Sequence, residues 1–383
     1  MSRARSFVVL FIGLVTILVM AACAPAAAPF APTAAPPTAT AIPATATAVP
    51  PTATTIPATA TAVPPTATTI PATATAVPPK PTAAAQPTVA ATPAAGNSSH
   101  GDSLGSLTLQ DDLGREVRLA QQPQRIVSLA PSITEILFAV GAGPQVVGVT
   151  KYCNYPPEAG QGREIVGGFS AKSLSVEKII SLNPDLVFAG GAIHEPVREA
   201  LEAAGVTVFN FDPHDLAGVY ANILAAGALT GHAAQAEEVV AGMKARIAKV
   251  TEVTATIPQD QRLKVFYEVW DEPLMTAGPA TFIGQVIELA GGINIFSDVK
   301  EQYPTVSSEA VVARGPDIIL GPSSHGEGLT AAKIGARPGW GELAAVQAGR
   351  IVIVDGDIIS RAGPRLADAL EAVTRGLYPE RFK

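Results

Sequence analysis

Two segments of this sequence are near-copies of each other, and they constrain the fold more strongly than any other feature. They occupy residues 174–188 and 306–320. The apolar positions match, and one Ser, one Glu, one Pro and one Asp recur at a constant offset. The recurring Ser, Glu and Asp are Ser175, Glu177 and Asp185 in the first copy and Ser307, Glu309 and Asp317 in the second.

Each copy has the pattern of a short helix followed by a short strand. The Ser hydroxyl can accept from the free N–H groups of a first helical turn, and a Glu in that turn complements the helix dipole. An Asn183-Pro184 pair ends one helix and a Gly315-Pro316 pair ends the other. The Asp then leads into an apolar strand. The chain is therefore predicted to contain two similar α/β halves.

The paired carboxylates have two interpretations. Taken alone, Glu177 or Glu309 needs no explanation beyond the helix dipole. Taken together, they present one acidic group at equivalent points of two lobes, where a symmetric partner could bind both. The residues by themselves leave both interpretations open.

Residues 1–23 have the pattern of an export signal. Two arginines precede an apolar run that ends at Met20, which is short for a membrane span and is followed by small residues. The Ala-Ala-Cys sequence ending at Cys23 resembles the bacterial lipobox. That resemblance implies a diacylglycerol on the Cys23 sulfur, cleavage before it and acylation of the new amino terminus. An ordinary cleaved signal peptide and an uncleaved anchor are the alternatives.

Residues 24–104 are predicted to be a disordered linker. Pro-Pro-Thr-Ala-Thr units repeat along it, and Lys80 is the only charged residue between Cys23 and His100. Such a segment cannot bury enough apolar surface to offset the entropy lost on ordering. Its proline content favours extended polyproline II conformations. We expect a stalk that lifts a folded domain off a membrane.

The globular part begins near residue 105. Strand patterns alternate with helix patterns through it, which indicates mostly parallel sheets. Apolar residues at helical spacing predict one long helix from about His232 to Val253. The expected domains are an N-terminal lobe over 105–230, a connecting helix over 231–257 and a C-terminal lobe over 258–383.

Two local features of the N-terminal lobe give testable detail. Residues 107–119 have the pattern of a hairpin whose turn lies at 111–114. A helix is predicted to begin at Pro131-Ser132, where Ser132 and Glu135 fit a capping box.

Composition and motifs argue against several functional classes. The net charge of −7 and the isoelectric point near 5.3 are unlike a nucleic-acid-binding protein. The sequence has no dinucleotide loop, phosphate loop or nucleophile elbow. Its five histidines are not spaced as zinc ligands, so neither a metal site nor a cofactor is expected. If Cys23 is lipidated, Cys153 has no disulfide partner and is interpreted as a partly buried small side chain.

Residues 125–383 resemble the class III periplasmic binding proteins, the solute-binding subunits of importers for cobalamin, haem and iron–siderophore complexes. The similarity is strongest to the cobalamin-binding branch. It rests on motifs spread over the globular part, namely residues 125–135, 147–157, 166–169, 276–278 and 291–296 together with the first near-copy.

The resemblance implies an α/β fold in which two lobes with mostly parallel sheets are joined by one long rigid helix, with the ligand cleft between the lobes. It also implies that Glu177 and Glu309 dock into arginine pockets of a membrane permease dimer, where bidentate pairing would fix the geometry. The permease and its ATPase subunits would complete an ABC importer. A monomer that catalyses no reaction is expected.

Cleft residues follow from the resemblance position by position. They are Pro131, Ser132, Tyr152, Phe169, Trp270, Tyr303 and Arg361. Flat aromatic faces suit a corrin or porphyrin ring. Phe169 and Tyr303 stand near positions where the cobalamin-binding branch has tryptophan.

Our hypothesis from the sequence is a lipid-anchored substrate-binding protein that captures a cobalamin-like corrinoid and delivers it to a permease. The first alternative keeps this role, with haem or a ferric siderophore as the ligand. The second alternative is a surface enzyme or adhesin displayed on the stalk. An enzyme would need a nucleophile–base set or a metal cluster, and an adhesin would not need the paired Glu.

Overall fold

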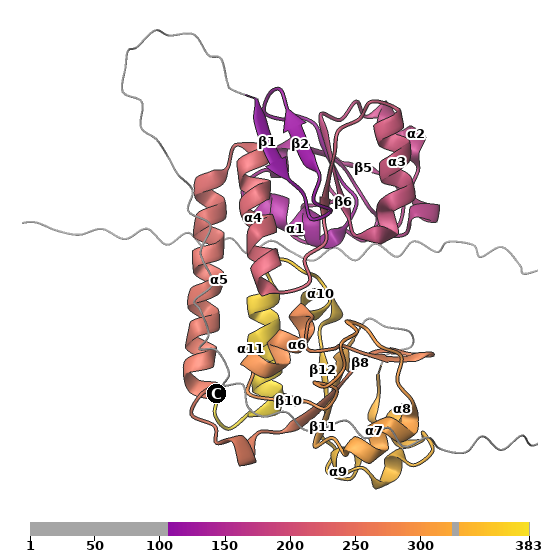
Figure 1. Cartoon of the computed structure of the whole chain (residues 1–383), viewed down its shortest axis with the longest axis vertical. Coiled ribbons are helices and arrows are strands. Elements are labelled where there is room, and N and C mark those ends of the chain that lie inside the picture. Colours follow the sequence, from indigo (N-terminus) through magenta and orange to yellow (C-terminus); the bar gives the residue numbers. More distant parts are fainter. Residues whose placement is uncertain (1–105, 324–328, 383) are drawn as a thin grey trace, which may run out of the picture. The chain divides into compact units, whose positions relative to one another are not determined.

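A computed structural model of the chain describes residues 106–323 and 329–382. The chain separates into two units, residues 1–93 and 94–383, and every described residue belongs to the second. The predicted signal sequence, Cys23 and the predicted linker lie outside the described residues. Within the second unit the elements form two α/β lobes beside one long helix, α5 (Figure 1).

The N-terminal lobe is built on a parallel sheet of order β5-β4-β3-β6-β7. Its strands are β3 (Ile126–Ser128), β4 (Val146–Val149), β5 (Glu164–Ile165), β6 (Leu186–Gly190) and β7 (Val208–Phe211). A separate antiparallel hairpin of β1 (Leu107–Gln110) and β2 (Glu116–Leu119) confirms the predicted hairpin and its turn.

Helices cover both faces of this sheet. They are α1 (Pro131–Ala139), α2 (Val176–Ser181), α3 (Glu195–Ala203) and α4 (Leu216–Thr230). Phe188 and Phe209 on one face pack in a core with α1 and α4, while Val187 and Val208 on the other face pack with α2 and α3. Since both faces are buried, successive strand residues are apolar, as is usual for parallel sheets.

The C-terminal lobe repeats this plan. Its parallel strands have the order β10-β8-β11-β12, and β9 pairs antiparallel with β8. The strands are β8 (Lys264–Asp271), β9 (Leu274–Thr276), β10 (Ile293–Asn294), β11 (Ile318–Pro322) and β12 (Ile351–Val354). The helices are α6 (Phe282–Leu289), α7 (Ser308–Arg314), α8 (Ala331–Gly335), α9 (Ala344–Gln347), α10 (Gly356–Ile359) and α11 (Leu366–Leu377).

The two near-copies occupy equivalent places in the two sheets. The first forms α2 and β6, with β6 between β3 and β7; the second forms α7 and β11, with β11 between β8 and β12. The repeated Asp has the same task in both. Asp185 Oδ2 accepts from the backbone N–H of Arg125, and Asp317 Oδ2 accepts from that of Lys264, each at the start of the neighbouring strand. These bonds explain why the Asp recurs.

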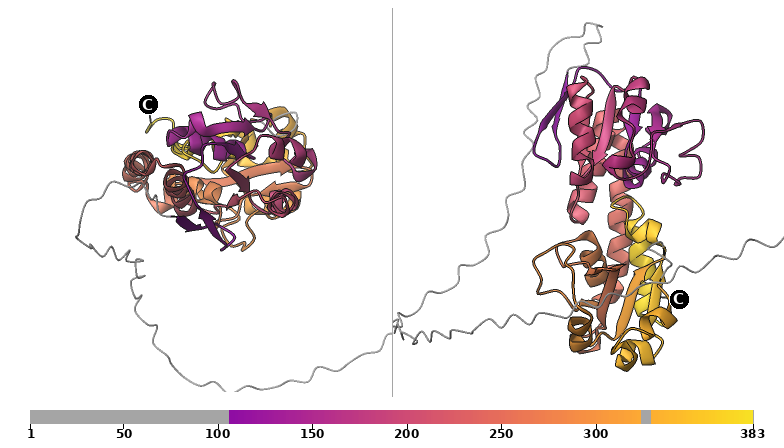
Figure 2. Two further views of the ribbon diagram at one scale, coloured as in Figure 1. Left: turned by 90° about the horizontal axis from the view of Figure 1, so that it is seen from above. Right: turned by 90° about the vertical axis from the view of Figure 1, so that its right-hand side faces the viewer.

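Helix α5 (Ala233–Thr254) is the predicted long helix, and it contacts both lobes. It packs against α1 and α4 of the N-terminal lobe and against α6 and α11 of the C-terminal lobe. Arg246 on α5 forms ion pairs with Asp368 and Glu371 on α11, at 2.5 and 2.8 Å. Figure 1 shows α5 running along one side of the two lobes, and the view from above in Figure 2 shows it end-on beside them. The helix therefore acts as a common spine.

Two local expectations need correction. The long helix is preceded by α4, which the sequence pattern did not predict because α4 is apolar around most of its circumference. The capping box at Ser132 is absent: α1 has Ala130 as its N-cap, with no side-chain cap bond, and Glu135 points into the interior. Within residues 106–323 and 329–382, no helix has the length and apolar character that a membrane span requires.

Candidate functional site

A cleft of about 650 Å³ lies between the two lobes. From the N-terminal lobe it is lined at the exits of β3, β6 and β7, by residues 130–132, 190–193 and 211–214. From the C-terminal lobe the lining comes from Thr281, Phe282, Gln302, Tyr303 and the segment around α10. Ligands of α/β proteins bind beyond the carboxyl ends of parallel strands, and the volume is that of a small-molecule site.

Six of the seven residues expected in the cleft line it. They are Pro131, Ser132, Tyr152, Phe169, Tyr303 and Arg361. Trp270 does not: it lies near the end of β8, in a separate hollow with Glu268 and Arg337, and its indole N–H donates to the Glu272 carbonyl at 2.9 Å. The structure therefore brings together residues from both lobes and separates Trp270 from them.

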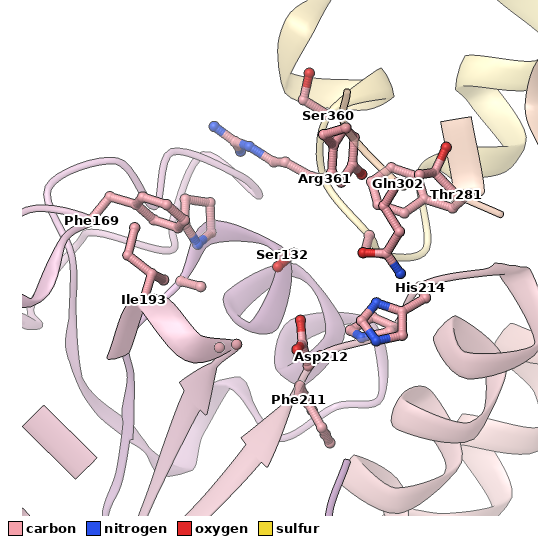
Figure 3. Close-up of a pocket in the computed structure, with 18 of the residues that line it drawn as sticks. Ser132, Phe169, Ile193, Phe211, Asp212, His214, Thr281, Gln302, Ser360 and Arg361 are labelled. Carbon is pink, nitrogen blue, oxygen red and sulfur yellow. The ribbon is translucent and has the colours of Figure 1, made fainter. Parts of the chain in front are cut away.

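One end of the cleft is aromatic and apolar. Tyr152 is 49% exposed, Phe169 44% and Ile193 43%. The Lys151 ammonium lies 5.0 Å from the centre of the Tyr152 ring. Large apolar side chains left exposed around a cavity indicate a binding surface. Phe169 and Ile193 lie next to each other at this end (Figure 3).

The cleft arginine, Arg361, is held in an ion cluster that joins the lobes. Its guanidinium donates to Glu135 of α1 at 2.8 Å and to the Asn154 side chain at 2.7 Å, and it lies 2.6 Å from Asp357. Arg365 also donates to Glu135, at 2.6 and 2.8 Å. Burial lowers the pKa of Arg365, but the Glu135 carboxylate outweighs this and raises it overall.

Glu135 was not recognised from the sequence as part of the site. It is 3% exposed and sits in the middle of the buried run of α1. A carboxylate is rarely buried without a partner. The sequence therefore did contain a signal, since a Glu among apolar helix residues requires a cation from elsewhere in the chain.

The opposite end of the cleft is polar. Asp212, His214, Gln302 and Thr281 lie there, away from Phe169 (Figure 3). Among the residues that the structure describes, none is a hydrogen-bond or ion-pair partner of the Asp212 carboxylate, the His214 ring or the Gln302 amide. Burial, and then the charge of Asp212, raise the pKa of Tyr303 to about 12. His214 lies directly before Asp215, the N-cap of α4, and lines the cleft.

The model for the family described as periplasmic binding protein matches residues 126–358, which is more than half of the chain. The chain belongs to the periplasmic binding protein family. The resemblance seen in the sequence is confirmed, and so is the fold class. This periplasmic binding protein is a substrate-binding protein of an ABC transporter, which implies a permease and an ATPase as partners, and it is not an enzyme.

Curated relatives cover most of the globular part. An uncharacterized ABC transporter substrate-binding lipoprotein of Bacillus subtilis, YvrC, is 34% identical over 72% of this chain and 87% of its own. A cobalamin-binding protein of Halobacterium salinarum is 32% identical over 71% of this chain and 74% of its own.

Solved structures of similar proteins are named for different ligands. The vitamin B12-binding protein BtuF of Vibrio cholerae is 30% identical, with a TM-score of 0.58, over 68% of this chain and 99% of BtuF. The haem-binding protein RhuT of a Roseiflexus species is also 30% identical, with a TM-score of 0.60, over 67% of this chain and 99% of RhuT. Overall similarity therefore does not distinguish a corrinoid from haem.

The repeated Glu residues of this periplasmic binding protein lie in matching positions. Glu177 is in the first turn of α2, whose cap Ser175 accepts from the Lys178 N–H. Glu309 is in the first turn of α7, whose cap Ser307 accepts from the Ala310 N–H. Both carboxylates are exposed, and both helices lie on the side of their lobes away from α5 (Figure 1). Hydrogen bonds from its own backbone N–H and from the Ser307 hydroxyl lower the pKa of Glu309.

Cys153 is buried and is free of any disulfide. Its sulfur lies 3.1 Å from the Thr134 hydroxyl and 3.2 Å from the Thr150 hydroxyl. These contacts fit the expected packing role of a small side chain. Within the described residues, no group of three or more His, Cys, Asp or Glu side chains is arranged to hold a metal ion.

Proposed function

We propose that this periplasmic binding protein captures a cobalamin-like corrinoid in the cleft between its lobes and hands it to the permease of an ABC importer. The observation that carries the proposal is the charge of the cleft. Its one arginine, Arg361, is neutralised by Glu135 and Asp357, whereas the Asp212 carboxylate faces the cavity without an ion-pair partner among the described residues.

The charge of these lining residues disfavours anionic ligands at the polar end of the cleft, while the Lys151 ammonium lies beside Tyr152 at the other end. Haem has two propionate carboxylates, and ferric siderophore complexes are commonly anionic, so either would need a free cation for tight binding. The periphery of a corrinoid has neutral amides that donate and accept hydrogen bonds. Asp212, His214 and Gln302 offer such amides acceptors and donors at the polar end of the cleft.

The aromatic residues that line the cleft support a flat ring system. Tyr152, Phe169 and Tyr303 expose ring faces or edges from both lobes, and each can bury a large area against a macrocycle. Curated relatives that are about one-third identical are named for cobalamin or vitamin B12. Both features agree with the corrinoid hypothesis.

Haem is the second candidate, because a specific observation favours it. Tyr152, Tyr303 and His214 line the cleft, and phenolate and imidazole groups are ligands of haem iron. In this alternative the docking and delivery would be unchanged.

Delivery is proposed to use the paired Glu. Glu177 and Glu309 would each pair with an arginine of the permease dimer, and the two contacts would fix register more than affinity. Lipid on Cys23 would hold this monomer at the outer side of the membrane through the linker.

Calorimetric titration of the full-length protein with cyanocobalamin, haemin and a panel of ferric siderophores tests the ligand. We expect tight one-to-one binding of cyanocobalamin and at least tenfold weaker binding of the others. Binding of haemin or a siderophore without cyanocobalamin binding would overturn the corrinoid proposal while leaving the family assignment intact.

A further inference from the structure

His194 lies directly under the aromatic end of the cleft and is fully buried. It follows residues 190–193, which line the cleft, but it does not line the cleft itself. Its Nδ1 accepts from the Gly190 N–H at 2.9 Å, so this nitrogen carries no proton. The proton must then sit on Nε2, which donates to the Phe169 carbonyl at 2.7 Å. The two bonds therefore fix one neutral tautomer.

The second bond joins two segments that are distant in the sequence. Phe169 belongs to the loop between β5 and α2, and His194 follows β6, 25 positions later. The Phe169 and His194 rings also meet edge to face, with centres 5.6 Å apart. Among the described residues, His194 is the only hydrogen-bond partner of the Phe169 carbonyl. The imidazole thus supports both the backbone and the ring of a cleft aromatic residue.

Phe169 needs such support because the residue is 44% exposed, which leaves its side chain with few packing contacts. The loop is held where Gly167 pairs with Leu174, where the Gly168 N–H donates to the Ser173 carbonyl, and where the Ser173 N–H donates to the Ser170 carbonyl. Gly167 has a φ of +139°, and a Cβ added there would lie 2.1 Å from the Ser173 carbonyl oxygen, so only glycine fits. Between these points the backbone of Phe169 is held by His194.

We propose that His194 is a positioning residue for ligand binding: it orders Phe169 in advance, in the orientation that packs on the ligand. This inference rests on the proposed function, since it assumes that the ligand contacts Phe169. A binding surface that is ordered before the ligand arrives loses less conformational entropy on binding. Burial lowers the pKa of His194, which keeps the ring in the neutral form that both bonds require.

Two substitutions separate the two hydrogen bonds. In His194→Gln the amide nitrogen can reach the place of Nε2 and still donate to Phe169. In His194→Asn the amide oxygen can replace Nδ1 and accept from Gly190, but the side chain is too short for Phe169. We expect His194→Asn to weaken cyanocobalamin binding about tenfold and His194→Gln to change it less than about threefold.

Combining His194→Asn with Phe169→Ala distinguishes a role that acts through Phe169 from a general structural role of His194. If His194 acts through Phe169, His194→Asn should cost less than about twofold in the Phe169→Ala background. An unchanged tenfold loss in that background would overturn the inference, as would equal affinities of the Asn and Gln variants. Hydrogen exchange gives a readout without ligand: His194→Asn should speed exchange at residues 170–174 and leave β3 unchanged.

These measurements separate failure of the inference from failure of the proposed function. If wild-type protein does not bind cyanocobalamin, the proposed function fails, while hydrogen exchange still tests the support of the loop. Nitrogen NMR of histidine-labelled wild-type protein needs no variant. We expect a neutral Nε2–H tautomer for His194 whose signal shifts on adding cyanocobalamin. An Nδ1–H tautomer, or a signal unmoved by bound cyanocobalamin, would overturn the inference.

Discussion

The carboxylate of Glu135 in the N-terminal lobe lies 2.8 Å from the guanidinium of Arg361 in the C-terminal lobe. The Glu135 side chain is 1% exposed and that of Arg361 is 12% exposed. Arg365 shares the same carboxylate at 2.6 Å. A largely buried ion cluster with residues from both lobes therefore forms part of the cleft wall. The cluster links the two lobes in addition to the packing of α5 against both.

Glu135→Gln should therefore destabilise the protein strongly. The substitution preserves shape but leaves two arginines facing a neutral amide, and breaking a buried ion pair in this way costs roughly 3 kcal/mol. Urea unfolding measures the loss. Glu237→Gln is the matched control, because Glu237 is exposed on α5 and has no ion-pair partner in the described residues. A loss below about 1 kcal/mol for Glu135→Gln would contradict the buried-cluster interpretation.

Removing a cleft aromatic should weaken binding, and Trp270 gives the control. Tyr152→Ala, Phe169→Ala and Tyr303→Ala should each cost roughly 1–3 kcal/mol of binding free energy for cyanocobalamin, because each loses an aromatic contact with the ring. Trp270→Ala should leave the affinity unchanged, since Trp270 lies outside the cleft. Calorimetric titration decides the point, and a large effect of Trp270→Ala would show that the ligand extends beyond the cleft.

Asp212→Asn should change ligand preference more than fold stability. The substitution removes the carboxylate that faces the cavity but keeps a group that hydrogen-bonds with amides. Haemin, which is anionic, should bind about tenfold tighter to the variant, whereas the affinity for cyanocobalamin should change less than about threefold. Asp260→Asn, at an exposed position in the turn before β8, controls for net charge. The same gain in that control would rule out a local effect of Asp212.

His194 should make stability fall in mild acid. Burial lowers its pKa below the ordinary value of 6.5, and the Phe169 carbonyl offsets this only in part. The unfolded chain therefore binds the proton first as the pH falls. The stability that His194 contributes is complete above about pH 6.5 and declines as the pH falls toward the lowered pKa of the folded state.

Urea unfolding of wild type and His194→Gln at about pH 7.5 and pH 5.5 measures this dependence. The wild type should lose roughly 1 kcal/mol more than the variant across this range, because the variant has no titrating ring at that position. Other histidines and the carboxylates are common to both proteins and cancel in the difference. Equal losses would show that His194 does not titrate differently on folding.

The sequence predicted the two lobes because each near-copy has the pattern of a helix followed by a strand. Ser, Glu and Asp recur where a helix start and a strand start need them, so α2, β6, α7 and β11 follow from local chemistry. Asn183, the only described residue besides glycine with positive φ, corresponds to Gly315, which is left-handed too. Helix ends of this kind are encoded locally.

The ion cluster could not be predicted in the same way. Glu135 and Arg361 are 226 positions apart, and no local pattern links them. The sequence placed Glu135 in a capping box and Arg361 in the cleft. Arg361 does line the cleft, but Glu135 forms no cap and pairs with Arg361. Trp270 illustrates a different limit. Similarity placed it in the cleft, but it lies near the end of β8, where β8 pairs with β9, in a hollow outside the cleft.

The paired Glu give a prediction about transport. Charge reversal of both residues, Glu177→Lys with Glu309→Lys, should abolish import of cyanocobalamin by cells that also have the cognate permease. Like charges would then face the arginines proposed on the permease, which costs docking several kcal/mol. The affinity of the purified protein for cyanocobalamin should stay within about twofold, because neither residue lines the cleft.

The matched control reverses the charge of two other exposed carboxylates, Glu237 and Glu342, one on α5 and one in the C-terminal lobe. That variant carries the same net charge change but leaves α2 and α7 intact, so it should import normally. Loss of import in both double variants would point to a general charge effect. Normal import with Glu177→Lys and Glu309→Lys would mean that the carboxylates serve their own helix starts and nothing beyond. Only selective loss supports docking through the two matched helices.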